Sequence, residues 1–179
     1  MQSCARLLVI ACVALAVCSC KSPVEGGRIS GLPASQVEAL NGLRNDINAE
    51  YGYRDGMPRI NLGPCGRFAR DFREGWNRRF NDKVNIVFVM ATEGSQCHHV
   101  LVKLPDGNYF DGGNGVISER ALLKLYPNSR IEEMKVFDPS LLDKRSYGLK
   151  RDYPECPNYS DEFMQRLIEK YLGRGLAGQ

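Results

Sequence analysis

A cysteine, a histidine and an aspartate in this chain have the types and the order of a catalytic triad. Cys65 follows a Gly-Pro pair and begins a segment with helical periodicity. A cysteine in the first turn of a helix lies at the positive end of the helix dipole, which favours the thiolate. A thiolate attacks a carbonyl carbon when a neighbouring base handles the proton. The sequence therefore predicts Cys65 as a nucleophile for acyl transfer.

The predicted base is His99, the second member of the pair His98-His99. His99 begins the alternating run HVLVKL, and Asp111 lies on the next predicted strand, NYFDG, after a Pro-Asp-Gly turn. A slightly staggered hairpin brings Asp111 close to His99, where its carboxylate can orient the imidazole ring. Because neighbouring residues of a strand point to opposite faces, only one of the two histidines can face the site. We expect this to be His99.

The elements that must position these residues are a helix that opens at Cys65 and two successive strands. In this order, GPCGRFA, HHVLVKL and YFDG resemble the corresponding sites of the papain-like and transglutaminase-like thiol enzymes. The resemblance covers residues 61–115 and implies Cys65 as nucleophile, His99 as base and Asp111 as orienting acid, without a cofactor. It also suggests Asn61 as an oxyanion-hole donor, beside the backbone N–H of Cys65. The implied activity is that of a cysteine peptidase, an amidase or a transglutaminase-like acyltransferase.

The same residues allow two other interpretations, of which the second stays open. Adjacent histidines can bind a metal, but the chain has none of the spacings H-E-x-x-H, H-x-x-E-H or paired Cys-x-x-Cys, so no metal is predicted. Buried cysteines are often inert, and the histidines could simply begin a buried hairpin. The chain would then be a non-catalytic binding, inhibitor or immunity lipoprotein on the same scaffold.

The beginning of the chain has the features of an export signal. MQSCAR carries a positive charge, LLVIACVALAV is apolar, and VCSC resembles a bacterial lipobox. Residues 1–19 are therefore predicted to be a lipoprotein-type signal peptide, with Cys20 as the lipidated residue. An ordinary signal cleaved nearby is the alternative. Residues 20–33, rich in Gly, Ser and Pro, are predicted to tether a single domain at residues 34–179 to the membrane.

Export has consequences for partners and for cysteine pairing. The expected location is the bacterial cell envelope, with the outer membrane favoured, where peptides, proteins and peptidoglycan are reachable substrates. The net charge of +3 does not favour nucleic acid as a partner. After the signal peptide and Cys20, the remaining cysteines are Cys65, Cys97 and Cys156. Because an oxidising compartment tends to pair thiols, we expect a Cys97–Cys156 disulfide that leaves Cys65 free.

The order of helices and strands given by the hydrophobic periodicity predicts an α+β fold. The resemblance to the papain-like and transglutaminase-like enzymes implies that the helix carrying the nucleophile packs on a small antiparallel sheet. The first helix is expected to begin at the capping-box sequence SQVE and to end near Gly52. The segment 53–64 has no period and is predicted to be loop. The other expected elements are an aromatic helix from Cys65, strands at 83–91, 99–104, 108–112 and 130–137, a helix at 118–126 and a last helix capped by Ser160.

Overall fold

The structure of the protein is a computed structural model that describes residues 31–146, 153–154 and 156–174. The predicted signal peptide, Cys20 and nearly all of the predicted tether lie outside these residues. The described part is mixed α+β, as the sequence predicts. None of the helices in this part is long and apolar enough to cross a membrane.

One antiparallel sheet organises the fold. Its strand order is β6-β5-β4-β3-β7, and every neighbouring pair is antiparallel. The predicted strands are present with shifted ends, and β6, a three-residue strand, was not predicted because it is too short to show a period. The strands are β3 (Asn85–Ala91), β4 (Cys97–Lys103), β5 (Tyr109–Asp111), β6 (Gly115–Ile117) and β7 (Ser129–Met134).

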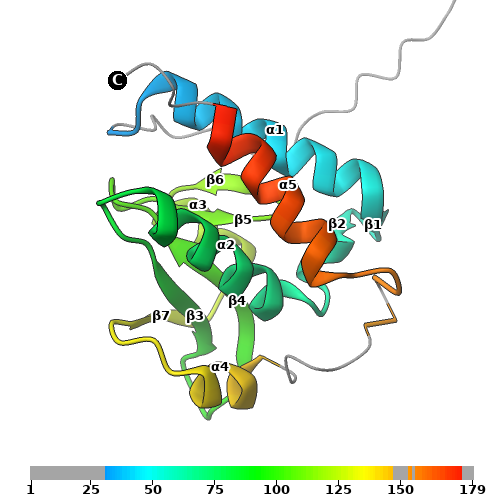
Figure 1. Cartoon of the computed structure of the whole chain (residues 1–179). Helices are drawn as coiled ribbons and strands as arrows, with labels where there is room; N and C mark the ends of the chain where they lie inside the picture. Colours follow the sequence, from blue (N-terminus) through cyan, green and yellow to red (C-terminus); the bar gives the residue numbers. More distant parts are fainter. Residues whose placement is uncertain (1–30, 147–152, 155, 175–179) are drawn as a thin grey trace, which may run out of the picture.

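Three helices form a layer on one face of this sheet. These are α1 (Ala34–Tyr51), α2 (Cys65–Arg79) and α5 (Asp161–Arg174), and α5 lies between α1 and α2 and contacts both (Figure 1). The predicted aromatic stripe of α2 packs in the core, where Phe68, Phe72 and Trp76 are buried. The layer holds α2 against β4, so the first turn of α2 lies near the strand that carries His99.

The opposite face of the sheet is covered by a shorter element, α3 (Glu119–Leu125). Leu122 of this helix packs in a second cluster with Val87, Val89 and Leu101 of the central strands. The central strands β3 and β4 are thus buried on both faces, which explains their almost continuous apolar sequence.

Several local predictions were corrected by the structure. Ser35 does not cap α1, because the helix already begins at Ala34 with Pro33 as its N-cap residue. The predicted loop contains a two-stranded sheet, β1 (Tyr53–Arg54) with β2 (Met57–Pro58), and a 3₁₀ helix, η1 (Arg59–Asn61). The helix α4 (Pro139–Arg145) was not predicted as an element of its own. The cap of the last helix is confirmed, because the Phe163 N–H donates to Ser160 Oγ at 3.3 Å.

Candidate active site

Cys65 is the first residue of α2, as predicted, and its side chain is half-buried. The glycine after it, Gly66, leaves room for a neighbouring element. A Cβ atom added at Gly66 would lie 2.3 Å from Cβ of Ser146, which follows α4. Gly66 therefore allows the end of α4 to pack directly on the first turn that carries the nucleophile.

A β-bulge decides which histidine points inward. Val89 pairs with His99, but the next residue, Met90, pairs with Cys97, so His98 is the extra residue on β4. His98 is exposed, whereas His99 is only 1% exposed. Bulges commonly redirect a side chain near an active site. Here the bulge lies near the start of β4, where His99 points into the protein and His98 toward the solvent.

His99 and Asp111 are joined by a hydrogen bond of 3.0 Å between Nε2 and Oδ2. Asp111 ends β5, and the pairing of Val102 with Phe110 gives the hairpin the small stagger that the sequence predicts. Asp111 is as buried as His99, at 1% exposure. The imidazole is therefore held in one orientation by a carboxylate that water does not reach.

The Asp111 carboxylate accepts four further hydrogen bonds. Oδ1 accepts from the backbone N–H groups of Gly113 and Asn114, at 2.9 and 2.6 Å, and from Asn61 Nδ2 at 3.1 Å. Oδ2 accepts from Asn114 Nδ2 at 2.9 Å, in addition to His99. A buried carboxylate surrounded only by donors is stabilised in its charged form.

The positive charge of His99 and the negative charge of Asp111 stabilise each other. Burial on its own would lower the pKa of His99, but the hydrogen bond with Asp111 and the interactions with the nearby Cys65 and the Asp111 charge outweigh it and raise the pKa to about 10. Burial on its own would raise the pKa of Asp111, but the hydrogen bond and the charge of His99, together with hydrogen bonds from Asn114, lower it. The favoured state is an imidazolium beside a carboxylate.

The second ring nitrogen of His99 is left for Cys65. Nδ1 is buried and has no hydrogen-bond partner among the described residues, because Nε2 is the nitrogen that Asp111 holds. Cys65 nevertheless lies close enough to contribute to the raised pKa of His99, and within the described part of the chain its Sγ makes a long contact of 3.9 Å with Gly63 O. The structure thus brings the predicted nucleophile, base and acid together.

Asn61 is positioned by Asp111 rather than by the sulfur. It is the last residue of η1 and is 7% exposed, and its Nδ2 donates a hydrogen bond to Asp111 Oδ1. The neighbouring Gly113 makes this possible, because an added Cβ would lie 2.4 Å from Pro58 and 2.6 Å from Asn61 Nδ2. The amide that was predicted as an oxyanion-hole donor is therefore bonded to the acid.

Sequence reasoning missed Tyr126, the residue after α3. Its ring stacks on the imidazole of His99, with the ring centroids 5.3 Å apart and the planes inclined by 16°. Tyr126 falls within a predicted helix, and no sequence signal distinguishes it from a packing residue. It lines a cavity of about 380 Å³ together with Cys65, His99, Cys97 and Asn61. A reacting group can reach the sulfur through this cavity.

The predicted Cys97–Cys156 disulfide is absent from the structure. Cys65 and Cys97 are both free thiols and line the same cavity. Cys156 does not line this cavity and is buried in the main hydrophobic core near Tyr51. The odd count of cysteines made a pair plausible, but their positions in the fold were not contained in the count.

Within the described ranges, no group of three or more His, Cys, Asp or Glu side chains is arranged to hold a metal ion. Comparisons of the chain with protein-family models, with curated proteins and with solved structures found no match. The chemistry of the site therefore has to be inferred from its own residues.

Proposed function

We propose that this protein carries out thiol-dependent acyl transfer, most simply the hydrolysis of a peptide, isopeptide or amide bond through a thioester at Cys65. The observation that carries the proposal is the pairing of His99 Nε2 with Asp111, which leaves Nδ1 for Cys65. A nucleophile, a base and an orienting group in hydrogen-bond sequence are the minimum that this chemistry needs.

The reaction would start from the Cys65 thiolate and the His99 imidazolium. Sγ attacks the carbonyl carbon, and the electrons of the C=O bond move onto its oxygen, near the free N–H groups of the first turn of α2. The intermediate collapses as His99 gives its proton to the amine nitrogen, so the C–N bond breaks and a thioester forms. Water then attacks the thioester, returns a proton to His99 and releases the acid and the thiolate. With an amine in place of water, the same steps give transamidation.

We also propose that the domain is a papain-like or transglutaminase-like core. The order of the elements supports this assignment, since a cysteine opens α2, a histidine lies near the start of β4 and the acid ends β5. The predicted lipoprotein signal at residues 1–19 and Cys20 support a location at the cell envelope. Peptides, proteins or peptidoglycan would be the substrates, and the lipid would hold the domain at the membrane.

An acylation experiment tests the proposal without knowledge of the substrate. The folded protein is incubated with p-nitrophenyl acetate, and the site of acetylation is determined by mass spectrometry of its peptides. We expect a thioester at Cys65 that forms quickly in the wild type, is slowed by His99→Ala and is abolished by Cys65→Ser. If Cys65 is acetylated no faster than Cys97, the chain is better described as a binding protein on this scaffold.

A further inference from the structure

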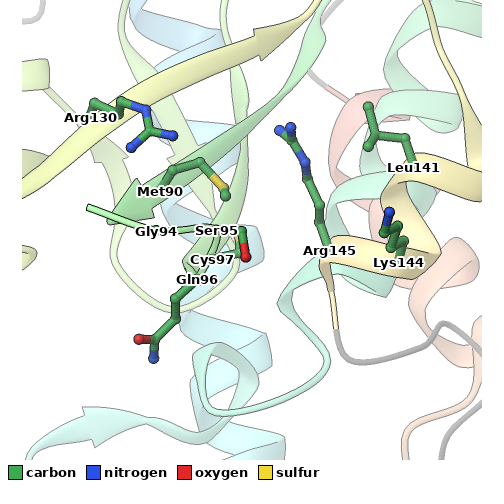
Figure 2. A pocket seen from close by; sticks show the side chains of 9 residues that line it. All are labelled: Met90, Gly94, Ser95, Gln96, Cys97, Arg130, Leu141, Lys144 and Arg145. Carbon is green, nitrogen blue, oxygen red and sulfur yellow. The ribbon is translucent and has the colours of Figure 1, made fainter. Parts of the chain in front are cut away.

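A second cavity lies next to the candidate active site. It has a volume of about 480 Å³ and opens between the β3–β4 loop, β7 and α4. Its lining consists of Met90, residues 94–97, Arg130, Leu141, Lys144 and Arg145. Figure 2 shows Arg130 and Arg145 entering it from opposite sides, with Met90 between them. A group bound here would be contacted by side chains from three separate elements.

The two cavities are adjacent. Cys97 and Arg145 line both the second cavity and the cavity that contains Cys65 and His99. A molecule bonded at Cys65 can therefore extend past Cys97 into the second cavity without leaving the surface of the protein. The second cavity therefore lies where a substrate subsite would be expected, next to the nucleophile.

The second cavity is cationic. Its lining includes three positively charged side chains, those of Arg130, Lys144 and Arg145, and no carboxylate. Glu132 offsets part of this charge from outside the lining, because it pairs with Arg130 at 3.0 Å and with Arg145 at 2.7 Å. The three cations and Glu132 together carry a net positive charge.

Among the described residues, Lys144 differs from the two arginines in having no compensating carboxylate. It forms no hydrogen bond or ion pair with the part of the chain that the structure describes, whereas both arginines are held by Glu132. The guanidinium of Arg145 also lies 4.8 Å from the ring of Phe88, which fixes its position at the junction of the two cavities. A fixed guanidinium beside a free ammonium suits an anionic group better than a neutral one.

We propose that this cavity is a carboxylate subsite, so that the substrate is a peptide or amide with an acidic side chain or a free carboxylate close to the bond that is cleaved. The role in substrate selection rests on the proposed function of Cys65. Met90 and Leu141 provide apolar contacts for the carbon chain that leads to the carboxylate, and Lys144 and Arg145 contact its oxygens.

Binding to a protein that cannot react tests the subsite separately from catalysis. The Cys65→Ser protein is titrated with blocked alanine-based peptide amides that carry one glutamate, placed at each position in turn, and with their glutamine counterparts. For at least one position, we expect the glutamate peptide to bind about tenfold more tightly, the size expected for a hydrogen bond to a charged group. The preference should weaken at high salt, because the cavity is open to solvent.

Charge variants in the Cys65→Ser background locate the effect. Lys144→Gln and Arg145→Gln should each reduce the preference for glutamate severalfold, and Arg145→Lys should retain most of it. Lys124→Gln is the matched control, since Lys124 is exposed on α3 at the other face of the sheet. Equal binding of all glutamate and glutamine pairs, including no detectable binding of either, would overturn the proposal. A preference that survives both glutamine variants would also overturn it.

The two proposals can fail independently. Acetylation of Cys65 by p-nitrophenyl acetate requires no carboxylate subsite, and peptide binding by Cys65→Ser requires no nucleophile. Rapid acetylation without a preference for glutamate would leave the thiol chemistry and remove the subsite. A preference for glutamate without acetylation would leave an anionic peptide-binding site on a non-catalytic protein.

Discussion

Nε2 of His99 lies 3.0 Å from Oδ2 of Asp111, and the two residues are each 1% exposed. This relationship fixes how the candidate site can work. It assigns Nε2 to the acid and leaves Nδ1 for the cysteine, so the ring cannot turn without breaking a buried, charge-assisted hydrogen bond. It also makes the site dependent on the groups that hold Asp111.

The first prediction concerns Asp111→Asn and Asp111→Ala. Asp111 is surrounded by donors on both oxygens, and an asparagine offers only one acceptor oxygen. Its NH₂ group would therefore face a donor on one side. We expect the rate of Cys65 acetylation to fall by about 10²-fold in the asparagine variant and further in the alanine variant.

Loss of buried hydrogen-bond partners should also lower the free energy of unfolding, by about 1–3 kcal/mol for each group left unsatisfied. Urea denaturation separates this effect from the effect on rate, provided that rates are compared under conditions where each variant is folded. Wild-type acetylation rates in both variants would remove Asp111 from the site.

The second prediction separates the two histidines. His99 is buried and bonded to Asp111, whereas His98 is the exposed extra residue of the bulge. His99→Ala should reduce Cys65 acetylation by 10²-fold or more, on the order expected for loss of a general base. His98→Ala is the matched control and should leave the rate within about twofold, since it takes no part in the proton transfer. A larger loss of rate in His98→Ala than in His99→Ala would mean that His98, not His99, is the base.

Local sequence patterns were enough to predict that Cys65, His99 and Asp111 lie close together. Cys65 at a helix start, His99 at the start of an alternating run and Asp111 after a Pro-Asp-Gly turn are all local patterns, and each depends on one element only. The hairpin turn fixes the approach of Asp111 to His99, so this contact could also be predicted.

The remaining features depend on contacts between distant segments, which no local pattern encodes. Tyr126 stacks on His99 from the end of α3, and Asn61 reaches Asp111 because Gly113 leaves room for η1. The incorrect disulfide had the same origin, since the number of cysteines says nothing about which ones meet. The strands β1, β2 and β6 have two or three residues, too few for periodicity to show.

The third prediction uses the different environments of the thiols in the cavity. Burial, followed by the nearby charge of Cys65, raises the pKa of Cys97 to about 11. At neutral pH, Cys97 therefore stays protonated and should react slowly with iodoacetamide, because the thiolate is the reactive form. Cys65 should be alkylated first, and the labelling of Cys97 should increase as the pH approaches 11. Peptide mapping after short exposures to iodoacetamide measures the labelling of Cys65 and of Cys97 separately. Labelling of Cys97 as early as that of Cys65 at pH 7 would contradict the prediction.

The fourth prediction concerns the contact between α4 and α2. An added Cβ at Gly66 would collide with Ser146, so Gly66→Ala should lower the free energy of unfolding by about 1–3 kcal/mol through overpacking. Gly173→Ala in α5 is the control, because its nearest neighbours are 3.8 Å or more from the added atom. It should leave stability unchanged or raise it by up to about 1 kcal/mol, as alanine favours a helix. Urea denaturation of both variants makes the comparison, and equal losses would mean that the Gly66 contact has no special role.

The last prediction tests whether Tyr126 positions the base. Its ring lies parallel to the His99 imidazole and covers it from the side of α3, and burial raises the pKa of its hydroxyl well above the usual range. A stacked aromatic contact contributes about 0.5–1.5 kcal/mol beyond the area that it buries. Tyr126→Phe keeps the ring and should retain the rate of Cys65 acetylation within about twofold, whereas Tyr126→Ala should slow it by up to about tenfold. The readout is the acetylation rate measured beside urea denaturation of the same variants. If phenylalanine is as harmful as alanine, the hydroxyl rather than the stacked ring is required; if neither changes the rate, the Asp111 hydrogen bond alone holds His99 in place.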